Sequence, residues 1–503
     1  MTAVSSDAAR GGALARPWLP LALSALAGVG VALGQAPFHL APLALLALGA
    51  AGWLCRSAPD ARGAAWRGFA AGTAHFAVTL HWIVEPFLVD VARHGWIAPF
   101  ALLFMATGFA LFWALAFWVA RRLAAGGWRF ALAFGAALAG VEVLRSLILT
   151  GFPWALIGYI WSEGPVAQAG AFVGPFGLTL ATTLVAGLLA AMGPRPAAVL
   201  AGAVIWGAAV LAFGARPPAP AAEAEAPVLR LVQPNAPQHL KWDPDYTQMF
   251  FDRALDLTAA PGAPDLILWP ETSVPYLIEP GHPVLQILSQ AAGGVPLVVG
   301  GQRAEGSRYF NSLVVIGEDG AIGDVYDKHH LVPFGEYVPF GDLAERFGIR
   351  GLAQGEYGYS PGPGQRLVDL GPLGQVLPLI CYEAIFPEEV GAVAPRANWL
   401  LQITNDAWFG TFAGPQQHLA IARMRAIEQG LPMVRVANTG ISAVISATGE
   451  ITAQLGLGEA GYLDAPLPPA MSPTPYARTG DWPAFALILL LLAGTIALRA
   501  KSS

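Results

Sequence analysis

The sequence predicts a multi-span α-helical membrane bundle that carries one α/β domain. Two observations support this prediction. First, 55% of the residues are hydrophobic and only 12% are charged, about half of the roughly 25% charge of an ordinary soluble domain. Second, the shortage of charge is confined to the first part of the chain and its end. Residues 216–481 hold most of the Asp and Glu, and they form short apolar runs separated by Gly and Pro turns.

Eight apolar runs have roughly the length that crosses a bilayer, about 17–25 residues. They cover residues 18–34, 39–55, 68–84, 97–120, 130–149, 171–192, 197–215 and 483–498. The sequence therefore predicts a membrane bundle of about seven transmembrane helices at 1–215, a globular domain at 216–481, and a final transmembrane helix with a cytoplasmic tail at 482–503. The Ala/Pro-rich stretch ARPPAPAAEAEAP is typical of a linker between bundle and domain.

Basic residues occupy alternate loops of the predicted bundle. Short loops rich in Arg and Lys stay in the cytoplasm, so the alternation predicts that both chain ends are cytoplasmic and that the globular domain lies on the outer face. The first run is expected to be retained, because no clean small-residue cleavage site follows it. The basic residues are Arg10, Arg16, Arg56, Arg62, Arg67, Arg121, Arg122, Arg129, Arg195, Arg499 and Lys501.

The globular region alternates β-type runs with helical patterns, which is typical of an α/β layered sandwich. Helices are expected at 246–259, 284–292 and 416–429. Many of the expected strands are apolar throughout, which indicates burial on both faces. These strands lie in VLRLVQPN, DLILWPET, VPLVVGG, YFNSLVVI, GQVLPLICYE, NWLLQITND, PMVRVAN and SAVISATG.

Three strand ends are followed by a reactive side chain. Glu271 follows LILWP, Lys328 follows GDVYD, and Cys381 follows VLPLI. Sites in open α/β sheets form at the carboxyl ends of strands, so we expect these three side chains to meet. Their chemistry is complementary, because the carboxylate can take the thiol proton, the ammonium favours the thiolate and stabilises an oxyanion, and the sulfur attacks a carbonyl.

Each of these residues also has an ordinary structural interpretation. A lone cysteine is most often a buried inert thiol, and Glu271 could cap a turn after Pro270. The predicted topology places Cys55 and Cys381 on opposite sides of the membrane, however, which leaves Cys381 as a free thiol in an oxidising compartment. Lys328 is one of only three lysines in a chain that otherwise uses arginine, which indicates a need for a compact charge.

Several motifs resemble a known family. WPET with Glu271, YDKHHLVPFGEYVP with Lys328 and ICYE with Cys381 resemble the Glu-Lys-Cys site of the carbon–nitrogen hydrolase (nitrilase) superfamily. The longer string HLVPFGEYVPF, the motif LKWDPD and the flanking apolar runs look like the bacterial apolipoprotein N-acyltransferases. The resemblance covers nearly the whole chain. It implies a nitrilase-like αββα sandwich on a bundle of eight helices, in the bacterial inner membrane with the domain on the periplasmic side.

The resemblance also implies a reaction. Enzymes of this family move an acyl chain from a phospholipid to the N-terminal amine of a diacylglyceryl-modified apolipoprotein. In this chain Cys381 would attack the acyl ester to form a thioester, with Glu271 as general acid and base and Lys328 on the oxyanion, and the amine would then take the acyl group. The membrane-embedded protein is expected to act as a monomer, with no cofactor, metal or nucleic-acid partner.

Four further residues are expected to support the site or bind substrate. Glu336 stands in an apolar loop framed by Pro and Gly, where an unpaired carboxylate would be costly, and the resemblance makes it a partner of Lys328 or a proton relay. The resemblance adds Trp242, Tyr382 and Glu383. For Tyr382 and Glu383, the alternative is a strand-end pair that faces solvent.

Two loops combine Gly hinges with aromatic residues, which suits mobile lids at a lipid interface. The lid candidates are Tyr357 and Tyr359 in FGIRGLAQGEYGYSPGPG, and Trp408 and Phe409 in DAWFGTFAGP. The alternative is that both segments are ordinary long surface loops.

The remaining histidines are not expected to bind metal. His329 and His330 are adjacent on an extended segment, where neighbouring side chains point to opposite faces. No HExxH motif or Cys/His cluster accompanies them or His418.

Two polar pairs are expected to have structural roles. Asn405 and Asp406 are expected to form an Asx-type turn that shapes the pocket. Glu142 and Arg145 are three residues apart on one helical face, so we expect them to pair inside the bundle, with a substrate pathway as the alternative.

Two other functions remain open from the sequence. A membrane-tethered nitrilase-type amidase would use the same three residues with water as the acceptor. A transporter or scaffold would use the outer domain only for binding, but apart from Glu142 and Arg145 the apolar runs lack the charged relays and broken helices of transport.

Overall fold

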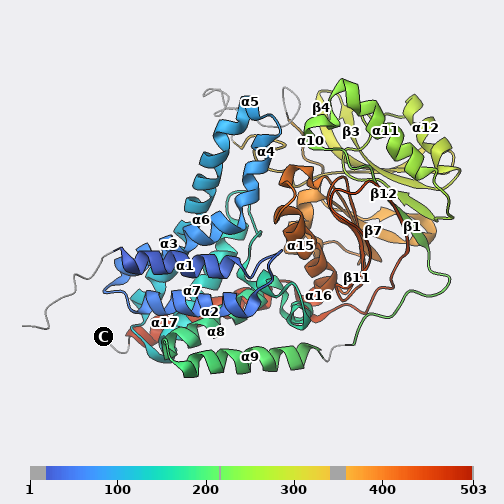
Figure 1. The fold of residues 1–503 in the computed structure, drawn as a ribbon. Coiled ribbons are helices and arrows are strands. Elements are labelled where there is room, and N and C mark those ends of the chain that lie inside the picture. The colour runs from blue at the N-terminus through green and yellow to red at the C-terminus, as the bar shows by residue number, and fades with distance from the viewer. Residues whose placement is uncertain (1–17, 215–216, 340–357, 501–503) are drawn as a thin grey trace, which may run out of the picture.

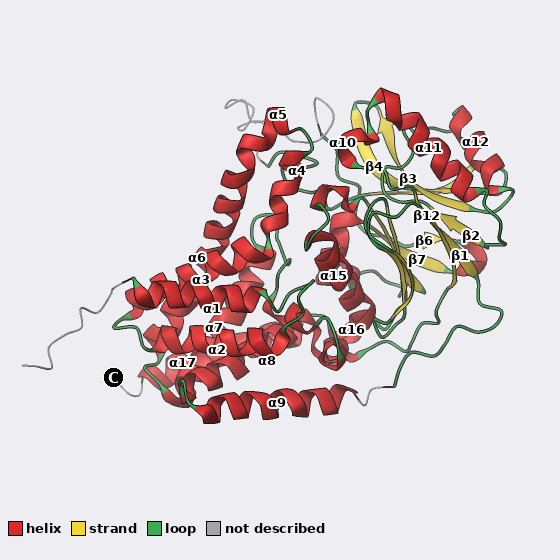
Figure 2. Ribbon diagram, viewed as in Figure 1, coloured by secondary structure: helices red, strands yellow, loops and turns green. Residues whose placement is uncertain are grey.

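The computed structural model describes residues 18–214, 217–339 and 358–500. The described chain forms a helical bundle and an α/β domain that lie side by side, and helix α9 (Pro196–Gly214) runs along one edge of the bundle (Figures 1 and 2). The predicted fold class, a helical membrane bundle joined to an α/β sandwich, is confirmed.

Within the described residues, each of the eight apolar runs contains a helix. These helices are α1 (Leu19–Ala32), α2 (Ala41–Arg56), α3 (Ala61–Thr79), α6 (Ala98–Leu123), α7 (Gly127–Leu147), α8 (Gly170–Met192), α9 and α17 (Trp482–Ala500). Five helical segments of the described chain are long and apolar enough to cross a membrane, namely Val91–Leu123, Gly127–Leu147, Pro165–Met192, Pro196–Gly214 and Trp482–Ala500. Because α1 and α2 are apolar but shorter, and α3 is not among the five segments, the number of eight spans remains a prediction.

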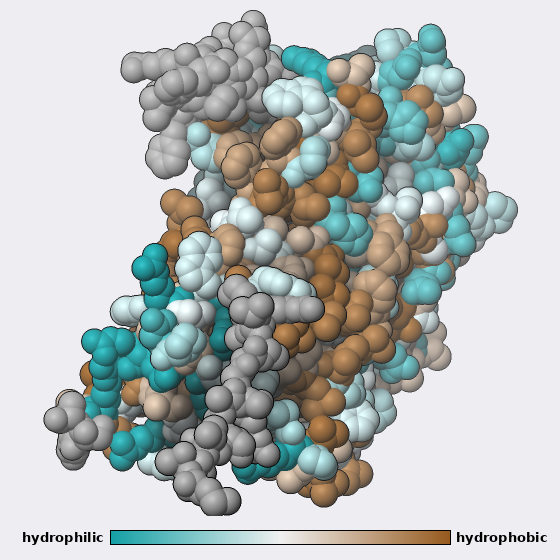
Figure 3. All heavy atoms as spheres, turned by 60° about the vertical axis from the view of Figure 1, so that its left-hand side comes forward, coloured by the Kyte–Doolittle hydropathy of each residue, from teal (hydrophilic) through white to brown (hydrophobic). Residues whose placement is uncertain are grey.

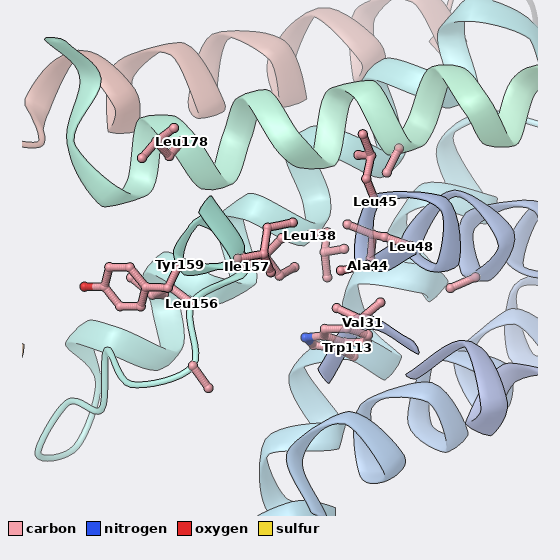
Figure 4. Packing of buried hydrophobic residues seen from close by; sticks show 14 of the residues in the cluster. Val31, Ala44, Leu45, Leu48, Trp113, Leu138, Leu156, Ile157, Tyr159 and Leu178 are labelled. Carbon is pink, nitrogen blue, oxygen red and sulfur yellow. The ribbon is translucent and has the colours of Figure 1, made fainter. Parts of the chain in front are cut away.

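Small residues let the bundle helices approach closely. A Cβ atom at Gly68 in α3 would lie 2.6 Å from the carbonyl oxygen of Trp113 in α6, and one at Gly72 would lie 2.9 Å from the Cα of Ala110. The result is a continuous apolar core, part of which is shown in Figure 4 with Val31, Ala44, Leu45, Leu48, Trp113, Leu138, Leu156, Ile157, Tyr159 and Leu178 labelled. Short helices connect the long ones: η1 (His81–Val84), α4 (Glu85–Leu88), α5 (Val91–His94), η2 (Gly95–Ile97), η3 (Ile157–Trp161) and η4 (Pro165–Ala169).

Two six-stranded sheets form the centre of the described α/β domain, with strand orders β12-β1-β2-β3-β4-β5 and β11-β10-β9-β8-β7-β6. Strands β1 to β3 and β7 to β9 are parallel, and the outer strands of each sheet are antiparallel. The strands are β1 (Val228–Gln233), β2 (Leu266–Leu268), β3 (Leu297–Glu305), β4 (Arg308–Ile316), β5 (Ile322–Asp327), β6 (Val368–Asp369), β7 (Gln375–Ile380), β8 (Trp399–Thr404), β9 (Met433–Ala437), β10 (Ser442–Ile445), β11 (Ile451–Leu455) and β12 (Gly461–Pro466).

The two sheets pack face to face, with helices on both outer faces. Leu231 and Val298 of the first sheet share a buried apolar cluster with Val376 and Leu401 of the second. The helices α10 (Gln238–Lys241), α11 (Pro244–Thr258) and α12 (Pro283–Ala292) lie on the side of the first sheet, and α14 (Pro387–Val390) and α15 (Gly414–Gln429) lie on the side of the second. The expected αββα sandwich is therefore present, and all the expected strands and helices are found in it.

Helix α15 joins the domain to the bundle. Its Ala422 and Ala426 pack in the apolar cluster of the second sheet, whereas Ile421, Met424 and Ile427 belong to the apolar core of the bundle. The helix is consequently buried on nearly all sides, and Figure 1 shows it between the sheets and the bundle. The bundle and the domain are therefore one continuous body of packed side chains.

Large apolar side chains cover much of the bundle's outer surface. Leu26, Phe104, Leu111, Leu211 and Leu490 are all exposed on the apolar helices, and Figure 3 shows a broad apolar area (brown) between hydrophilic areas (teal). Soluble proteins rarely expose such patches. The apolar surface is therefore that of a protein embedded in lipid.

Candidate active site

Cys381 lies at a sharp turn between β7 and the short helix η6 (Cys381–Ile385). Its φ angle is 52°, in the left-handed region that costs a residue with a side chain about 1–3 kcal/mol and clusters at functional sites. Burial is the largest cause of the raised pKa of the Cys381 thiol; the charge of Glu271 adds to the increase, and Lys328 opposes it. The thiol is therefore protonated at rest and needs a base when it attacks.

Glu383 anchors the turn that presents Cys381. Its Oε2 accepts a hydrogen bond of 2.7 Å from the backbone N–H of Ile380, and its Oε1 accepts bonds from the Tyr326 hydroxyl at 2.8 Å and the His329 N–H at 2.9 Å. The Glu383 side chain is fully buried, so it does not face solvent. Its contacts make it a support of the cysteine turn.

Glu271 and Lys328 converge in a buried polar site. Lys328 Nζ lies 3.3 Å from Glu271 Oε1 and 2.9 Å from Glu336 Oε1. The Asn311 amide donates to both carboxylates, at 2.7 Å to Glu271 and 2.9 Å to Glu336, and the Asn405 N–H donates to Glu271 Oε2 at 2.9 Å. The predicted partnership of Glu336 with Lys328 is thus present in the structure.

Lys328 remains a cation despite its burial. Burial alone would lower the pKa of Lys328, but the adjacent Glu336 and Glu271 carboxylates raise it well above its ordinary value. An ammonium held in this way can stabilise a developing oxyanion. Glu271 reaches the site because Gly300 on β3 lets its segment approach closely, since a Cβ atom there would lie 2.6 Å from the Glu271 Cα.

Trp242 and a second buried lysine lie behind Glu271. Lys241 Nζ donates to the Glu271 carbonyl at 3.2 Å and to Thr272 Oγ1 at 3.0 Å, and it lies 5.4 Å from the centre of the Trp242 ring. Burial lowers the pKa of Lys241 to about 8, although the nearby Glu271 acts in the opposite direction. Lys241 therefore fixes the Glu271 backbone, a role that sequence reasoning missed although lysine scarcity pointed to it.

A polar network fixes the turn from the other side. The Cys381 carbonyl accepts a hydrogen bond from Gln402 Nε2 at 3.1 Å, and His418 Nε2 lies 3.2 Å from the same oxygen. His418 Nδ1 lies 2.9 Å from Asp406 Oδ1, and Asp406 also pairs with Arg435. Burial would raise the pKa of Asp406, but Arg435 and His418 hold it at about 2. Asp406 therefore acts as a buried anchor of this network, a role beyond the Asx turn expected from the sequence.

Tyr382 connects the site to the membrane bundle. It is buried, and its hydroxyl donates to the Gly151 carbonyl at 3.3 Å in the loop after α7. The same loop is held by Arg145, which donates to the Trp154 carbonyl at 2.9 Å and pairs with Glu142 at 2.6 Å. The expected pairing of Glu142 with Arg145 is present, and it positions the loop beneath Tyr382.

The lid candidates have different surroundings. Phe409 packs on the bundle, with its ring centre 4.8 Å from Trp82 and 5.6 Å from Trp154. Trp408 is half-buried beside it in the short helix η7 (Asp406–Phe409). The Tyr359 hydroxyl accepts a hydrogen bond of 2.5 Å from the Gln302 amide. The backbone N–H of Tyr359 donates to the Glu336 carbonyl at 2.8 Å. Tyr357 lies outside the described residues.

One expectation about the histidines is wrong. His329 and His330 do not point to opposite faces, because both rings reach Glu389 in α14. The segment between Lys328 and Leu331 is irregular rather than a strand, so the alternation of a strand does not apply to it.

Comparison with known proteins defines the class of this chain. The family model described as Carbon-nitrogen hydrolase matches residues 228–476. The model described as Apolipoprotein N-acyltransferase N-terminal domain matches residues 27–188. The two units of the structure thus correspond to a carbon–nitrogen hydrolase domain and a membrane bundle that accompanies it.

Full-length relatives identify the family. Over 516 residues the chain is 40% identical to the Apolipoprotein N-acyltransferase of Caulobacter vibrioides, covering 97% of this chain and 96% of that protein. It is 37% identical to the protein of the same name from Rhodopseudomonas palustris, covering 97% of each. The chain therefore belongs to the apolipoprotein N-acyltransferase family and is an enzyme.

Two solved structures are each similar to about half of this chain. An amidase from Nesterenkonia sp. AN1 is 20% identical, with a TM-score of 0.34, and the match covers 52% of this chain and 99% of that one. A CN-hydrolase superfamily protein from Xanthomonas campestris is 20% identical, with a TM-score of 0.35, and covers 53% of this chain and 97% of that one.

Proposed function

We propose that this protein transfers an acyl chain from a membrane phospholipid, through a thioester on Cys381, to the N-terminal amine of a diacylglyceryl-modified apolipoprotein. The observation that carries the proposal is the arrangement of Glu271, Lys328 and Cys381 around one buried site in a domain that packs on an apolar bundle. The name shared by the relatives supplies the acceptor class.

In the first half-reaction, the Cys381 sulfur attacks the carbonyl carbon of the acyl ester. Glu271 takes the thiol proton as the S–C bond forms, because the raised pKa of the thiol leaves little thiolate beforehand. The Lys328 ammonium stabilises the oxyanion of the tetrahedral intermediate. The C–O bond then breaks, Glu271 returns the proton to the leaving alcohol oxygen, and the acyl thioester remains.

In the second half-reaction, the acceptor amine attacks the thioester carbonyl. Glu271 takes a proton from the attacking nitrogen, the C–S bond breaks, and the proton goes to the Cys381 sulfur. The products are an amide and the original thiol, so no cofactor is consumed. Glu336 keeps Lys328 in place throughout, since Lys328 Nζ bonds to it at 2.9 Å.

Mass spectrometry of the purified enzyme tests the covalent step. Wild type incubated with phospholipid alone should gain the mass of one acyl chain on the peptide that contains Cys381, and Cys381→Ser should not. A second addition, of an acceptor peptide, should remove the adduct and acylate the peptide amine. An adduct that never forms before the acceptor is added would favour direct transfer and contradict the thioester.

A hydrolase that uses water as the acceptor is the second candidate, because the same three residues serve carbon–nitrogen hydrolases. The embedded bundle favours the transferase, since a hydrolase of soluble amides has no use for a lipid-facing surface. Labelled acyl chain recovered as free fatty acid, with none on the peptide, would support the hydrolase instead.

The proposal includes a location. We place the catalytic domain on the periplasmic side of the bacterial inner membrane and both termini in the cytoplasm, because basic residues occupy alternate loops. The protein is proposed to act as a monomer, since one chain holds the whole site.

A further inference from the structure

A second cluster of polar side chains lies beside the catalytic site. His329 and His330 directly follow Lys328, and both face Glu389 in α14. His329 Nε2 lies 3.2 Å from Glu389 Oε2, and His330 Nδ1 lies 2.7 Å from Glu389 Oε1. All three groups offer a ligand atom, and these atoms lie within 4.8 Å of one another.

In each imidazole ring, the outer nitrogen, which faces away from Glu389, determines whether the inner nitrogen is a hydrogen-bond donor or acceptor. His329 Nδ1 lies 2.7 Å from Glu383 Oε1, and His330 Nε2 lies 3.3 Å from the Thr150 carbonyl. Both partners are acceptors, so each outer nitrogen carries a hydrogen and donates it. In a neutral imidazole the other nitrogen is then an acceptor. With both rings neutral, two lone pairs would face the Glu389 carboxylate, and such an arrangement needs positive charge between them.

One divalent cation can supply this charge in place of two extra protons. The geometry points to His329 Nε2, His330 Nδ1 and Glu389 as a three-ligand site for Zn²⁺ or a similar first-row divalent cation. Two histidines, a carboxylate and an open position are a common zinc set, and ligands at about 2.0–2.1 Å from a tetrahedral ion lie about 3.3 Å apart. The 3.2 Å between His329 Nε2 and Glu389 Oε2 is close to this value, and the 2.7 Å between His330 Nδ1 and Glu389 Oε1 is shorter, so the Glu389 side chain would have to move to bind an ion.

The surroundings match those of a metal site. Metal-binding histidines usually donate their second N–H to a carboxylate or a backbone carbonyl, which fixes the ring, and Glu383 and Thr150 serve these two roles here. The His330 ring is also stacked on Phe386, with the ring centres 3.7 Å apart. Glu389 Oε2 lies 3.2 Å from His329 Nε2 but has no hydrogen bond of regular geometry among the described residues. His329 and Glu389 also line an open hollow of the domain.

The proposed cation would join three parts of the protein. His329 belongs to the segment after Lys328, Glu389 belongs to α14, and Thr150 belongs to the bundle loop that also meets Tyr382. Glu383, which anchors the Cys381 turn, holds the other side of the His329 ring. The cation would act as a brace between the domain and the bundle, and it would take no part in the acyl transfer.

Direct measurement of bound zinc tests the site. The full-length enzyme, purified in detergent with an affinity tag that lacks histidine, is stripped with a chelator and dialysed against increasing Zn²⁺, and bound zinc is measured by mass spectrometry. Wild type should bind one tight equivalent. Glu389→Gln and His330→Asn should each weaken binding by about tenfold or more. His239→Gln, at an exposed histidine of α10, should bind as wild type does.

Cobalt substitution provides a measurement that needs no variant. Co²⁺ added to the stripped wild-type enzyme should give the intense visible absorption bands of a four-coordinate ion, and Zn²⁺ should abolish them. Weak six-coordinate bands, no bound zinc in wild type, or equal zinc in wild type and the folded Glu389→Gln variant would each overturn the proposal and leave two protonated histidines as the source of the charge.

Discussion

At the scale of single residues, burial explains why Cys381, the proposed nucleophile, needs Glu271 to serve as its base. The thiol is almost inaccessible, and the negative charge of Glu271 adds to the effect of burial, so the pKa of Cys381 lies above its ordinary value. Lys328 opposes this shift but does not cancel it. The protein therefore holds a protonated thiol next to a base, rather than a preformed thiolate.

This arrangement predicts how Cys381 reacts with an alkylating agent. Since its pKa is raised, the thiolate fraction should rise about tenfold per pH unit across the range below that pKa. Alkylation of the resting enzyme by iodoacetamide should therefore accelerate from pH 7 to pH 9 without a plateau, as measured on the Cys381 peptide by mass spectrometry. Cys55, buried in the bundle, is the internal control and should stay unlabelled. A plateau below pH 8 would contradict a raised pKa.

The Glu271→Gln variant should lose the base that the protonated thiol needs. This variant keeps the shape and the Lys241 contact to the backbone, but it removes the base. General base catalysis contributes about 10²–10⁴-fold, so thioester formation with phospholipid should slow by that order, as measured by time-resolved mass spectrometry. Thermal stability should change little by comparison. Equal rates in the variant and wild type would assign the base to another residue.

At the scale of elements, α15 is the joint between the domain and the bundle, and Gln417 is its main polar contact. Its Oε1 accepts from Trp82 at 3.2 Å and Trp154 at 2.7 Å, and its Nε2 donates to the carbonyls of Ala36 and Thr79, both at 3.1 Å. A single buried amide thus satisfies four groups from separate parts of the bundle. The next residue, His418, faces the Cys381 turn.

Replacement of Gln417 by Leu should therefore be costly. Each buried group left unpaired costs about 1–3 kcal/mol, so four such groups predict a loss of several kcal/mol and a clear fall in the melting temperature. Gln416→Leu is the matched control, because the one side-chain hydrogen bond that Gln416 makes to the described residues is an exposed one, from its Nε2 to the Thr411 carbonyl at 3.3 Å. If both variants melted alike, the joint would depend on apolar packing alone.

The short helix η7 gives a prediction about water. Phe409 packs between Trp82, Trp154 and His418, so it lies at the contact between the bundle and the domain, where we expect it to help keep water from the thioester. Replacing Trp408 and Phe409 by Ser should raise the ratio of fatty-acid release to amine acylation more than it slows thioester formation. The assay uses labelled phospholipid and limiting acceptor peptide. If both activities fell together at an unchanged ratio, these residues would position substrate and water would be excluded elsewhere.

The sequence predicted the elements whose signals are local. Apolar runs predicted the long helices and the central strands, and Glu271, Lys328 and Cys381 could be found because each stands just after such a strand. The polar strands β11 and β12 carry no apolar run and were not expected. Asn311 and the His418 network were also missed, since their partners lie far away in sequence and only the fold brings them together. His329 and His330 both contact Glu389 because the segment that carries them is irregular. Periodic sequence patterns do not describe such a segment, so this contact was not expected.

At the scale of the whole molecule, the orientation in the membrane is open to direct test. In a background without Cys55, a cysteine at Glu223, exposed in the linker to the domain, should react with a membrane-impermeant maleimide in intact cells. A cysteine at Ser57, exposed in the loop after α2, should react only after the cells are permeabilised. The reverse pattern would place the catalytic domain in the cytoplasm and remove its access to exported lipoproteins.

Helix α17 has a consequence for how the protein is made. It packs against α7 and α8 through Ile488, Ala139 and Leu180, yet the ribosome synthesises it only after the entire catalytic domain. The helices that precede the domain must therefore remain without α17 while more than half of the chain is synthesised. Any factor that delays synthesis of the domain also delays the packing of α17 into the bundle. Quality control in the cell therefore acts on the bundle and the domain together.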